Sequence, residues 1–258
     1  MKEPYFKTNH GQLFNDDCLN LISTMEPPDL IITSPPYNVG VNYDAHNDNM
    51  SEDEYFDWIE EVFSSLYRIM PDDGRLSINI PYETNGRFFF AGEYWAILRT
   101  IGYKWAGMAD LNEHSAQRPK PSAWGSWLSP SAPYIYNPKE CVMIFYKNKW
   151  KKDTKGTSYF NKKNKNEFIE CVSGMWNYNA ETKGLTKANF SLDIPLKALK
   201  ILSWKEDLVY DPFMGSGTTA LACEMLGRKW IGSEKSENYC NVTRDRLKRY
   251  VTCDYFFE

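Results

Sequence analysis

The feature that most restricts the fold of this chain is its regular alternation of short apolar runs with longer stretches of helical spacing. This alternation favours an α/β fold in which helices pack against a mostly parallel central sheet. The expected strands lie at residues 29–33, 75–80, 140–146, 208–210 and 229–231. The expected helices lie at residues 51–70, 94–100, 194–203, 218–226 and 236–250.

Composition places the chain among folded globular proteins. Its 258 residues are 42% hydrophobic and 25% charged, which excludes collagen-like, low-complexity and wholly disordered chains. Because the formal net charge is -4, any surface that binds nucleic acid must be a local basic face. No stretch approaches the roughly 18 consecutive apolar residues of a membrane helix, so we expect no membrane contact and a cytoplasmic location.

The cysteines give no sign of a metal site or of disulfides. Six of them lie scattered along the chain without a Cys-x-x-Cys pair, and only three histidines accompany them. This pattern indicates neither a zinc site nor a disulfide framework. We expect reduced cysteines in a cytosolic fold and no metal.

A stiff polar loop follows the first expected strand. Pro35 and Pro36 remove two backbone donors in succession, so the strand must end just before them. The prolines are flanked by Ser34 and Tyr37, neither of which a tight turn alone would require. The loop therefore places a hydroxyl and an aromatic ring at the carboxyl end of a buried strand.

A glycine-rich turn, residues 211–219 (DPFMGSGTT), joins an expected strand to an expected helix. Backbone amides and the positive end of the helix dipole can face a polar ligand there. Glu234 follows Asp211 by 23 residues, the spacing at which an acidic side chain meets a ribose diol. No lysine follows the glycines as in a phosphate-binding loop, which favours an adenosine ligand without phosphates and disfavours an ATPase.

Together, these two segments resemble the amino-group DNA methyltransferases that use S-adenosylmethionine. In that family a Ser/Asp/Asn-Pro-Pro-aromatic loop holds the target base and a Phe-x-Gly-x-Gly loop holds the cofactor. Residues 34–37 (SPPY) and 213–217 (FMGSG) match these two loops. Because the catalytic loop precedes the cofactor loop, the order resembles the permuted β-class of the family. The resemblance implies a Rossmann-like methyltransferase fold.

The resemblance also implies roles for the residues of both loops. Ser34 and the Pro35 carbonyl would accept hydrogen bonds from the target amino group, Pro36 would complete the loop, and Tyr37 would stack on the flipped base. An acidic residue would bind the ribose of S-adenosyl-L-methionine, and another would lie near its adenine. The expected cofactor residues are Asp17 at the adenine, Glu234 at the ribose, and Asp211, Phe213, Gly215, Ser216, Gly217 and Thr218 in the turn.

The resemblance extends over most of the chain. Residues 13–18 (LFNDDC), 124–130 (WGSWLSP) and 140–147 (ECVMIFYK) resemble further stretches of the family. Residues 187–191 (KANFS) depart from the His-Pro-Ala-x-Phe-Pro pattern of many relatives, which leaves the methionine end of the cofactor unassigned. We expect one methyltransferase domain over residues 1–258.

A basic segment between residues 147 and 165 contains eight lysines and one aspartate. A solvated loop would explain this composition without any function. By the resemblance, residues 147–186 would instead form a small target-recognition insert. Lysines would contact DNA phosphates and aromatic rings would lie near the flipped base, the candidates being Lys149, Lys151, Lys152 and Lys155, and Tyr159, Phe160, Trp176 and Tyr178.

The function we favour from sequence is site-specific methylation of the cytosine N4 amine in double-stranded DNA, within a restriction-modification system. By the resemblance, serine at the first loop position is more common for cytosine N4 and aspartate for adenine N6. None of the six cysteines follows proline, as the nucleophile of ring-carbon methyltransferases usually does. Adenine-N6 methylation, RNA methylation and a non-catalytic nucleic-acid binder are the alternatives. A companion restriction endonuclease and a homodimer are further expectations.

Overall fold

The structure of the chain is a computed structural model. It describes residues 3–40, 49–84, 88–113, 125–126, 128–134, 139–153, 156–179 and 191–254. The sequence-based expectations on Lys155 and on residues 187–190 lie outside these ranges.

The described residues form one mixed sheet of nine strands in the order β1-β2-β9-β8-β3-β4-β6-β5-β7. Five of the neighbouring pairs are parallel, which confirms the expected α/β architecture, and the β1–β2, β4–β6 and β5–β6 pairs are antiparallel. The strands are β1 (Phe6–Lys7), β2 (Gly11–Asn15), β3 (Leu30–Thr33), β4 (Arg75–Pro81), β5 (Lys104–Glu113), β6 (Glu140–Tyr146), β7 (Met175–Tyr178), β8 (Leu208–Asp211) and β9 (Lys229–Glu234).

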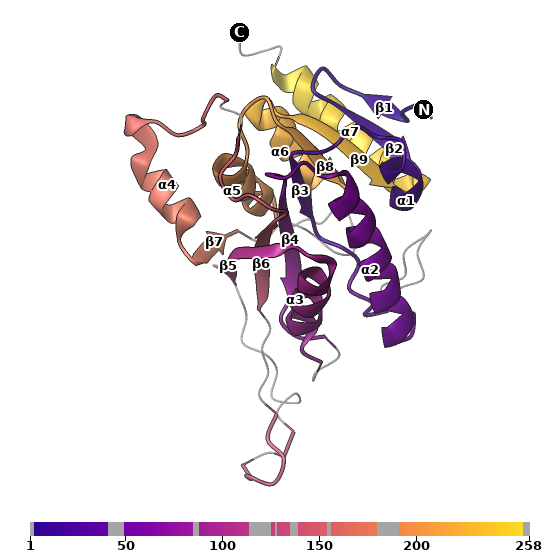
Figure 1. Cartoon of the computed structure of the whole chain (residues 1–258), viewed down its shortest axis with the longest axis vertical. Helices are drawn as coiled ribbons and strands as arrows, with labels where there is room; N and C mark the ends of the chain where they lie inside the picture. The colour runs from indigo at the N-terminus through magenta and orange to yellow at the C-terminus, as the bar shows by residue number, and fades with distance from the viewer. Residues whose placement is uncertain are drawn as a thin grey trace.

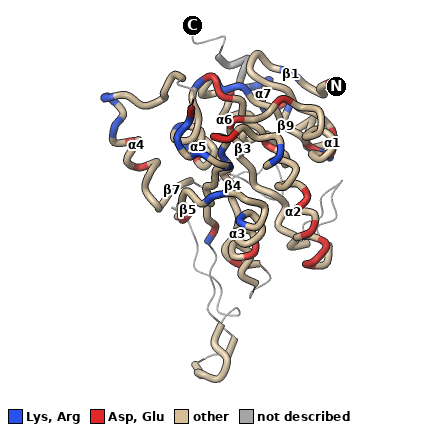
Figure 2. Tube along the Cα trace, in the orientation of Figure 1, with Lys and Arg blue, Asp and Glu red and all other residues tan. Residues whose placement is uncertain are grey.

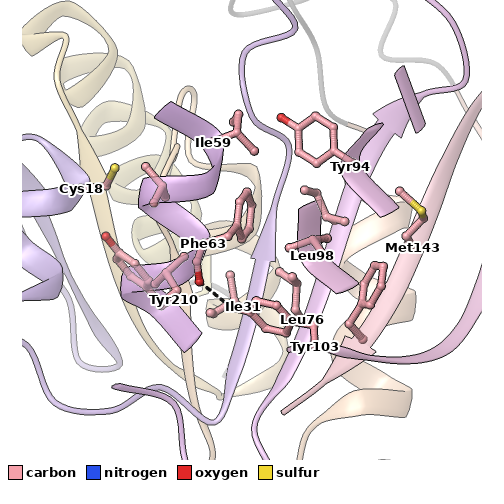
Figure 3. Packing of buried hydrophobic residues seen from close by; sticks show 14 of the residues in the cluster. Cys18, Ile31, Ile59, Phe63, Leu76, Tyr94, Leu98, Tyr103, Met143 and Tyr210 are labelled. Carbon is pink, nitrogen blue, oxygen red and sulfur yellow. Dashed lines mark hydrogen bonds between the residues drawn. The ribbon is translucent and has the colours of Figure 1, made fainter. Parts of the chain in front are cut away.

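Helices cover both faces of this sheet (Figure 1). One face packs against α1 (Cys18–Ile22), α2 (Glu52–Ile69) and α3 (Phe90–Ile101), and the other against α5 (Asp193–Leu202), α6 (Thr218–Leu226) and α7 (Glu237–Asp254). Figure 3 shows Phe63 of α2 and Leu98 of α3 packed with Ile31 and Leu76 of the sheet. Neighbouring residues of β3 belong to opposite cores, because side chains alternate across a strand.

The sequence of α2 explains both of its ends. Ser51 and Glu54 form a capping box, in which each side chain accepts a hydrogen bond from the other residue's backbone amide. Three acidic residues in the first turn complement the positive end of the helix dipole. The helix stops before Pro71, which cannot continue the hydrogen-bond ladder.

The order in which successive strands are added to the sheet reverses between β8 and β3, which are parallel neighbours. From β8 it passes through α6 to β9 on one side, and from β3 it passes through α2 to β4 on the other. Because parallel crossovers are right-handed, the two helices lie on opposite faces of the sheet. The loops after β8 and β3 therefore diverge at the carboxyl edge of the sheet, where open α/β sheets bind their ligands.

The elements at the far edge of the sheet are not predicted from the sequence. β5 is interrupted by a bulge between Trp105 and Gly107, which disturbs the alternation of its side chains. β7 and α4 (Lys165–Val172), which follows a short 3-10 turn (Lys162–Asn164), lie within the expected insert. β7 pairs in parallel with β5, so part of this segment extends the main sheet.

Two residues of the expected insert, residues 147–186, have roles that differ from those expected. Trp176 of β7 is 1% exposed and its indole N–H donates to the Cys171 carbonyl, so it belongs to the core and not to a base-binding surface. Three lysines precede and begin α4, and two acidic residues follow them within the helix (Figure 2): Lys162, Lys163 and Lys165, then Glu167 and Glu170. The expected insert therefore carries acidic residues as well as lysines.

Lys152 is the second exception, because it lies inside the protein. Its side chain is 3% exposed, and its Nζ lies 2.9 Å from a carboxylate oxygen of Asp207 and 3.8 Å from one of Asp29. Burial raises the pKa of Asp207, and the Lys152 ammonium opposes that rise. The expectation that Lys152 contacts DNA is therefore wrong, since its charge serves this internal pair.

Replacing Lys152 should destabilise the fold far more than replacing its neighbour. Lys152→Ala leaves Asp207 buried without its cation and should lower the free energy of unfolding by about 3–5 kcal/mol. Lys151 is exposed, so Lys151→Ala should change that free energy by less than about 0.5 kcal/mol. Urea unfolding of the two variants measures the difference, and equal losses would contradict the assignment.

Candidate active site

The two loops singled out from the sequence meet at the carboxyl edge of the sheet. The first follows β3 and the second follows β8, and these strands are adjacent. The hydroxyl of Thr33, the last residue of β3, donates to a carboxylate oxygen of Asp211, the last residue of β8, at 2.8 Å. Both groups are buried, so the bond fixes the start of one loop relative to the other.

Tyrosines from the two helices α2 and α3 hold the Ser-Pro-Pro-Tyr loop. The Tyr55 hydroxyl donates to the Pro36 carbonyl at 2.7 Å and lies 2.6 Å from the Tyr94 hydroxyl. A carbonyl only accepts, so Tyr55 must give its proton to Pro36 and accept the proton of Tyr94. The loop conformation is thus supported from inside the core.

Tyr37 turns its hydroxyl inward. Its oxygen lies 2.9 Å from Ser34 Oγ and accepts a hydrogen bond from Asn79 at 2.9 Å. Its ring meets the edge of Phe90, with centroids 6.1 Å apart. Burial is the main cause that raises the pKa of Tyr37 well above its ordinary value, so the phenol stays protonated near neutral pH.

The glycine-rich turn depends on two left-handed residues. Gly215 has φ 54° and Gly217 has φ 78°, a region in which side chains are strained. A Cβ on Gly217 would lie 2.5 Å from the Thr243 side chain, whereas one on Gly215 would meet no atom closer than 3.9 Å. Gly217 therefore allows α7 to pack closely, and the space beside Gly215 is open.

Glu234 closes the turn from the end of β9. One of its carboxylate oxygens accepts the Gly215 amide at 2.9 Å, and the other accepts the Ser236 amide at 2.8 Å. Burial is the main cause that raises the pKa of Glu234, and these two amides oppose the rise. The carboxylate expected from its spacing thus lies directly at the glycines.

Asp211 is surrounded by donors of its own chain. One oxygen accepts from Thr33 and from the Phe213 amide at 3.0 Å, and the other accepts from the Thr219 hydroxyl at 2.6 Å. Burial raises the pKa of Asp211 to about 6, against the lowering effect of these hydrogen bonds. Its geometry is that of a residue that shapes the turn.

The other expected cofactor residues surround the turn. Asp17 caps α1 through the Leu19 amide and pairs with Lys235 at 3.1 Å, close to the end of β9. The Phe213 ring packs on Trp58 of α2 with centroids 5.3 Å apart. The structure thus brings elements from both ends of the chain to one place.

Sequence reasoning missed two residues of α7 that support the turn. Thr243 donates to the Gly215 carbonyl at 2.9 Å. Arg246 donates to the Ser216 carbonyl at 3.3 Å and to the Thr218 hydroxyl at 2.8 Å. Both lie 28 to 30 positions beyond the residues that they contact, with α6 and β9 in between, and no local pattern marks them. Lys149 and Lys151 are exposed, and the Lys149 amide donates to the Asp72 carbonyl just before β4, at the end of that strand opposite the catalytic loop. The Lys149 side chain pairs with Asp153 at 2.7 Å.

A protein-family model described as DNA methylase matches residues 28–245. The chain belongs to this family of N6 and N4 DNA amino-methyltransferases. Among curated relatives, the Type II methyltransferase M.MjaVI of Methanocaldococcus jannaschii is 39% identical over 179 residues, covering 69% of this chain and 90% of that protein. The Type II methyltransferase M.ScaI of Streptomyces caespitosus is 25% identical over an alignment that covers 95% of this chain and 84% of that protein.

Solved structures show the same fold. The PvuII DNA methyltransferase, named cytosine-N4-specific, aligns with a TM-score of 0.70 and 20% identity over 94% of this chain and 88% of its own. Protein TTHA0409 of Thermus thermophilus, complexed with S-adenosyl-L-methionine, aligns with a TM-score of 0.70 and 22% identity over 92% and 93% of the two chains. The Rossmann-like methyltransferase architecture expected from the motifs is confirmed.

The methyltransferase family uses S-adenosyl-L-methionine, and the residues at the turn fit this cofactor. The open space at Gly215 lets a ligand approach the backbone, and the partly buried carboxylate of Glu234 offers acceptors for hydroxyl groups. Within the described ranges, no group of three or more metal-binding side chains is arranged to hold an ion. In the same ranges, no helix of the methyltransferase has the length and apolarity to cross a membrane.

The raised pKa of Asp211 should make stability depend on pH. The folded pKa of about 6 exceeds the ordinary 3.8, so folding binds a proton and the stabilisation is lost as pH rises through about 6. Between pH 4 and pH 7 the unfolding free energy of the wild type should fall by about 2 kcal/mol more than that of Asp211→Asn, which does not titrate. Urea unfolding at both pH values measures this, and parallel curves would contradict it.

Proposed function

We propose that this methyltransferase transfers a methyl group to the exocyclic N4 amine of cytosine in double-stranded DNA, as part of a restriction-modification system. The observation that carries the proposal is that Ser34 and the glycine-rich turn follow adjacent strands. The last residues of these strands, Thr33 and Asp211, are joined by a buried hydrogen bond. A group that holds an amine and a turn that fits the methyl donor are thereby kept side by side.

The chemistry needs positioning more than acid or base strength. The lone pair of a base amino group is delocalised into the ring, which makes the nitrogen a poor nucleophile. S-adenosyl-L-methionine supplies an electrophilic sulfonium methyl group. The protein must therefore hold the nitrogen in line with that methyl and accept hydrogen bonds from its protons, as proximity and orientation provide much of the rate.

The catalytic loop has the acceptors for this task. Ser34 Oγ and the Pro35 carbonyl accept the two amino N–H groups, which favours the pyramidal nitrogen of the transition state. Tyr37 stacks on the base, which must leave the duplex to reach the site. The Tyr55 bond to Pro36 keeps the loop rigid while the base is held.

Serine at the first loop position favours cytosine, because members of the family that methylate adenine N6 more often have aspartate there. The relatives named Type II methyltransferases support the restriction-modification context. A companion endonuclease and a homodimer belong to the same proposal. Lys149 and Lys151 are exposed and contact DNA phosphates, which adds affinity without encoding sequence.

In the cofactor site, Glu234 binds the ribose hydroxyls and Asp17 lies near the adenine. The turn residues 211–218 shape the open cradle between them. A charged acceptor is well suited to a diol, because hydrogen bonds to charged groups are about twice as strong as neutral ones.

Removing the Ser34 hydroxyl should slow methylation without weakening cofactor binding. By analogy with the loss of an oxyanion-hole donor, Ser34→Ala should cost about 10² to 10³ in rate. Ser23 is exposed, so Ser23→Ala should keep the wild-type rate.

Mass spectrometry of nucleosides from the product DNA identifies the base, and 6-methyladenine alone would reject the cytosine assignment. Methylation of RNA but not DNA would reject the proposed substrate.

Removing the Glu234 carboxylate should weaken cofactor binding. Loss of a charged acceptor costs about 1.5–3 kcal/mol, so Glu234→Ala should raise the Kd of S-adenosyl-L-methionine about tenfold or more. Glu237→Ala alters an exposed carboxylate three positions further on and should leave the Kd unchanged. Calorimetry compares the two variants, and an unchanged Kd for Glu234→Ala would remove this residue from the site.

A further inference from the structure

A carboxylate from the start of the antiparallel strand β6 reaches the catalytic loop. Glu140 is the first residue of β6, and the antiparallel register places it opposite the end of β4. Asn79 of β4 is 3% exposed and donates from Nδ2 to Glu140 Oε2 at 2.6 Å and to the Tyr37 oxygen at 2.9 Å. The Tyr37 hydroxyl lies 3.5 Å from the same Glu140 oxygen and 2.9 Å from Ser34 Oγ.

The charge of Glu140 determines which way the Asn79 amide faces. If the Asn79 amide were flipped, its oxygen would lie at hydrogen-bond distance from the carboxylate oxygen. Both atoms are acceptors, so no proton would lie between them and they would repel each other. Nδ2 must therefore face both Glu140 and Tyr37. The Tyr37 oxygen consequently accepts one hydrogen bond and has one lone pair and one proton left.

The Tyr37 proton has three acceptors within reach: Ser34 Oγ, Glu140 Oε2, and the Asn79 backbone carbonyl, whose oxygen lies 3.4 Å from the Tyr37 hydroxyl. If Tyr37 gives its proton to Ser34, the Ser34 proton points away from Tyr37 and opposes the N–H groups of the target amine. If Tyr37 gives its proton to Glu140, its free lone pair accepts the Ser34 proton. Both lone pairs of Ser34 Oγ then remain for the amino group. The Asn79 carbonyl is neutral, whereas Glu140 is a carboxylate, and hydrogen bonds to charged acceptors are about twice as strong as neutral ones, which favours Glu140 as the acceptor of the Tyr37 proton.

We propose that Glu140 is a positioning residue of the methylation reaction, acting through Asn79 and Tyr37 to keep Ser34 an acceptor toward the target amine. It takes no proton from the substrate and touches no reacting atom. This inference rests on the proposed role of Ser34. It also gives the Tyr37 hydroxyl a task that is separate from the stacking of the Tyr37 ring.

Asn79 Oδ1 is a buried acceptor without a hydrogen bond, and this supports a functional reason for the orientation of the Asn79 amide. In the described part of the chain, no donor reaches Oδ1 of Asn79, although this atom is buried. A buried acceptor without a partner costs about 1–3 kcal/mol. A catalytic constraint is one of the explanations for keeping such a group in a core.

Single-turnover methylation of unmethylated genomic DNA with labelled S-adenosyl-L-methionine tests the proposal. Glu140→Gln should lower the rate about 10- to 100-fold while the Kd values for cofactor and DNA stay within about twofold. Tyr37→Phe should cause a similar loss, and adding it to Glu140→Gln should cost little more, because both break one chain. Glu60→Gln, at an exposed position of α2, is the matched control.

Exchanging the amide and the carboxylate separates a positioning role from a structural one. Asn79→Asp combined with Glu140→Gln retains one of each group and places the carboxylate where Nδ2 now meets Tyr37. This double variant should regain at least tenfold over Glu140→Gln alone. A wild-type rate for Glu140→Gln, or fully additive losses with Tyr37→Phe, would overturn the proposal.

A measurement without turnover keeps the inference independent of the substrate. In protein labelled with carbon-13 at the tyrosine Cζ, the Tyr37 signal, assigned with Tyr37→Phe, should shift in Glu140→Gln because its hydroxyl changes acceptor. An unchanged signal would overturn the proposal even if the variant were slow. If wild-type product is 6-methyladenine, the cytosine assignment fails, while the rate ratios still decide the role of Glu140.

Discussion

The bond from Thr33 to Asp211 joins the two loops on which the methyltransferase depends. At the point where the strand order reverses, helices leave to opposite faces, and this bond continues the pairing of β3 with β8 to the ends of the two strands, where the loops begin. The Asp211 carboxylate receives donors from β3, from the turn and from α6, so one buried charge fixes three elements. Burial disfavours that charge, and the donors compensate for it.

Features governed by local rules could be predicted from the sequence. The helix α2 follows from its capping box and from Pro71, and the Ser-Pro-Pro-Tyr loop follows from its prolines. The glycine-rich turn follows from glycines that alone tolerate its backbone. The spacing of Glu234 then placed a carboxylate at that turn, where the structure has it.

Features that depend on distant pairing could not be predicted. β7 forms because β5 offers a free edge, and Trp176 is buried only as a result of that pairing. Lys152 and Lys151 are adjacent lysines in one basic segment, yet only Lys152 meets Asp207. The sequence shows the charge of the two lysines but not whether each side chain points into the core or into solvent, because tertiary packing determines a side chain's partners.

The mixed character of the sheet explains how Glu140 reaches the catalytic loop. A parallel strand would bring its last residue to the carboxyl edge, whereas antiparallel β6 brings its first. A carboxylate 103 positions beyond Tyr37 thereby lies beside the same hydroxyl. Asn79 of β4 and Glu140 of β6 can approach only because these two strands pair side by side. The antiparallel strand therefore extends the site beyond the two loops that the parallel strands provide.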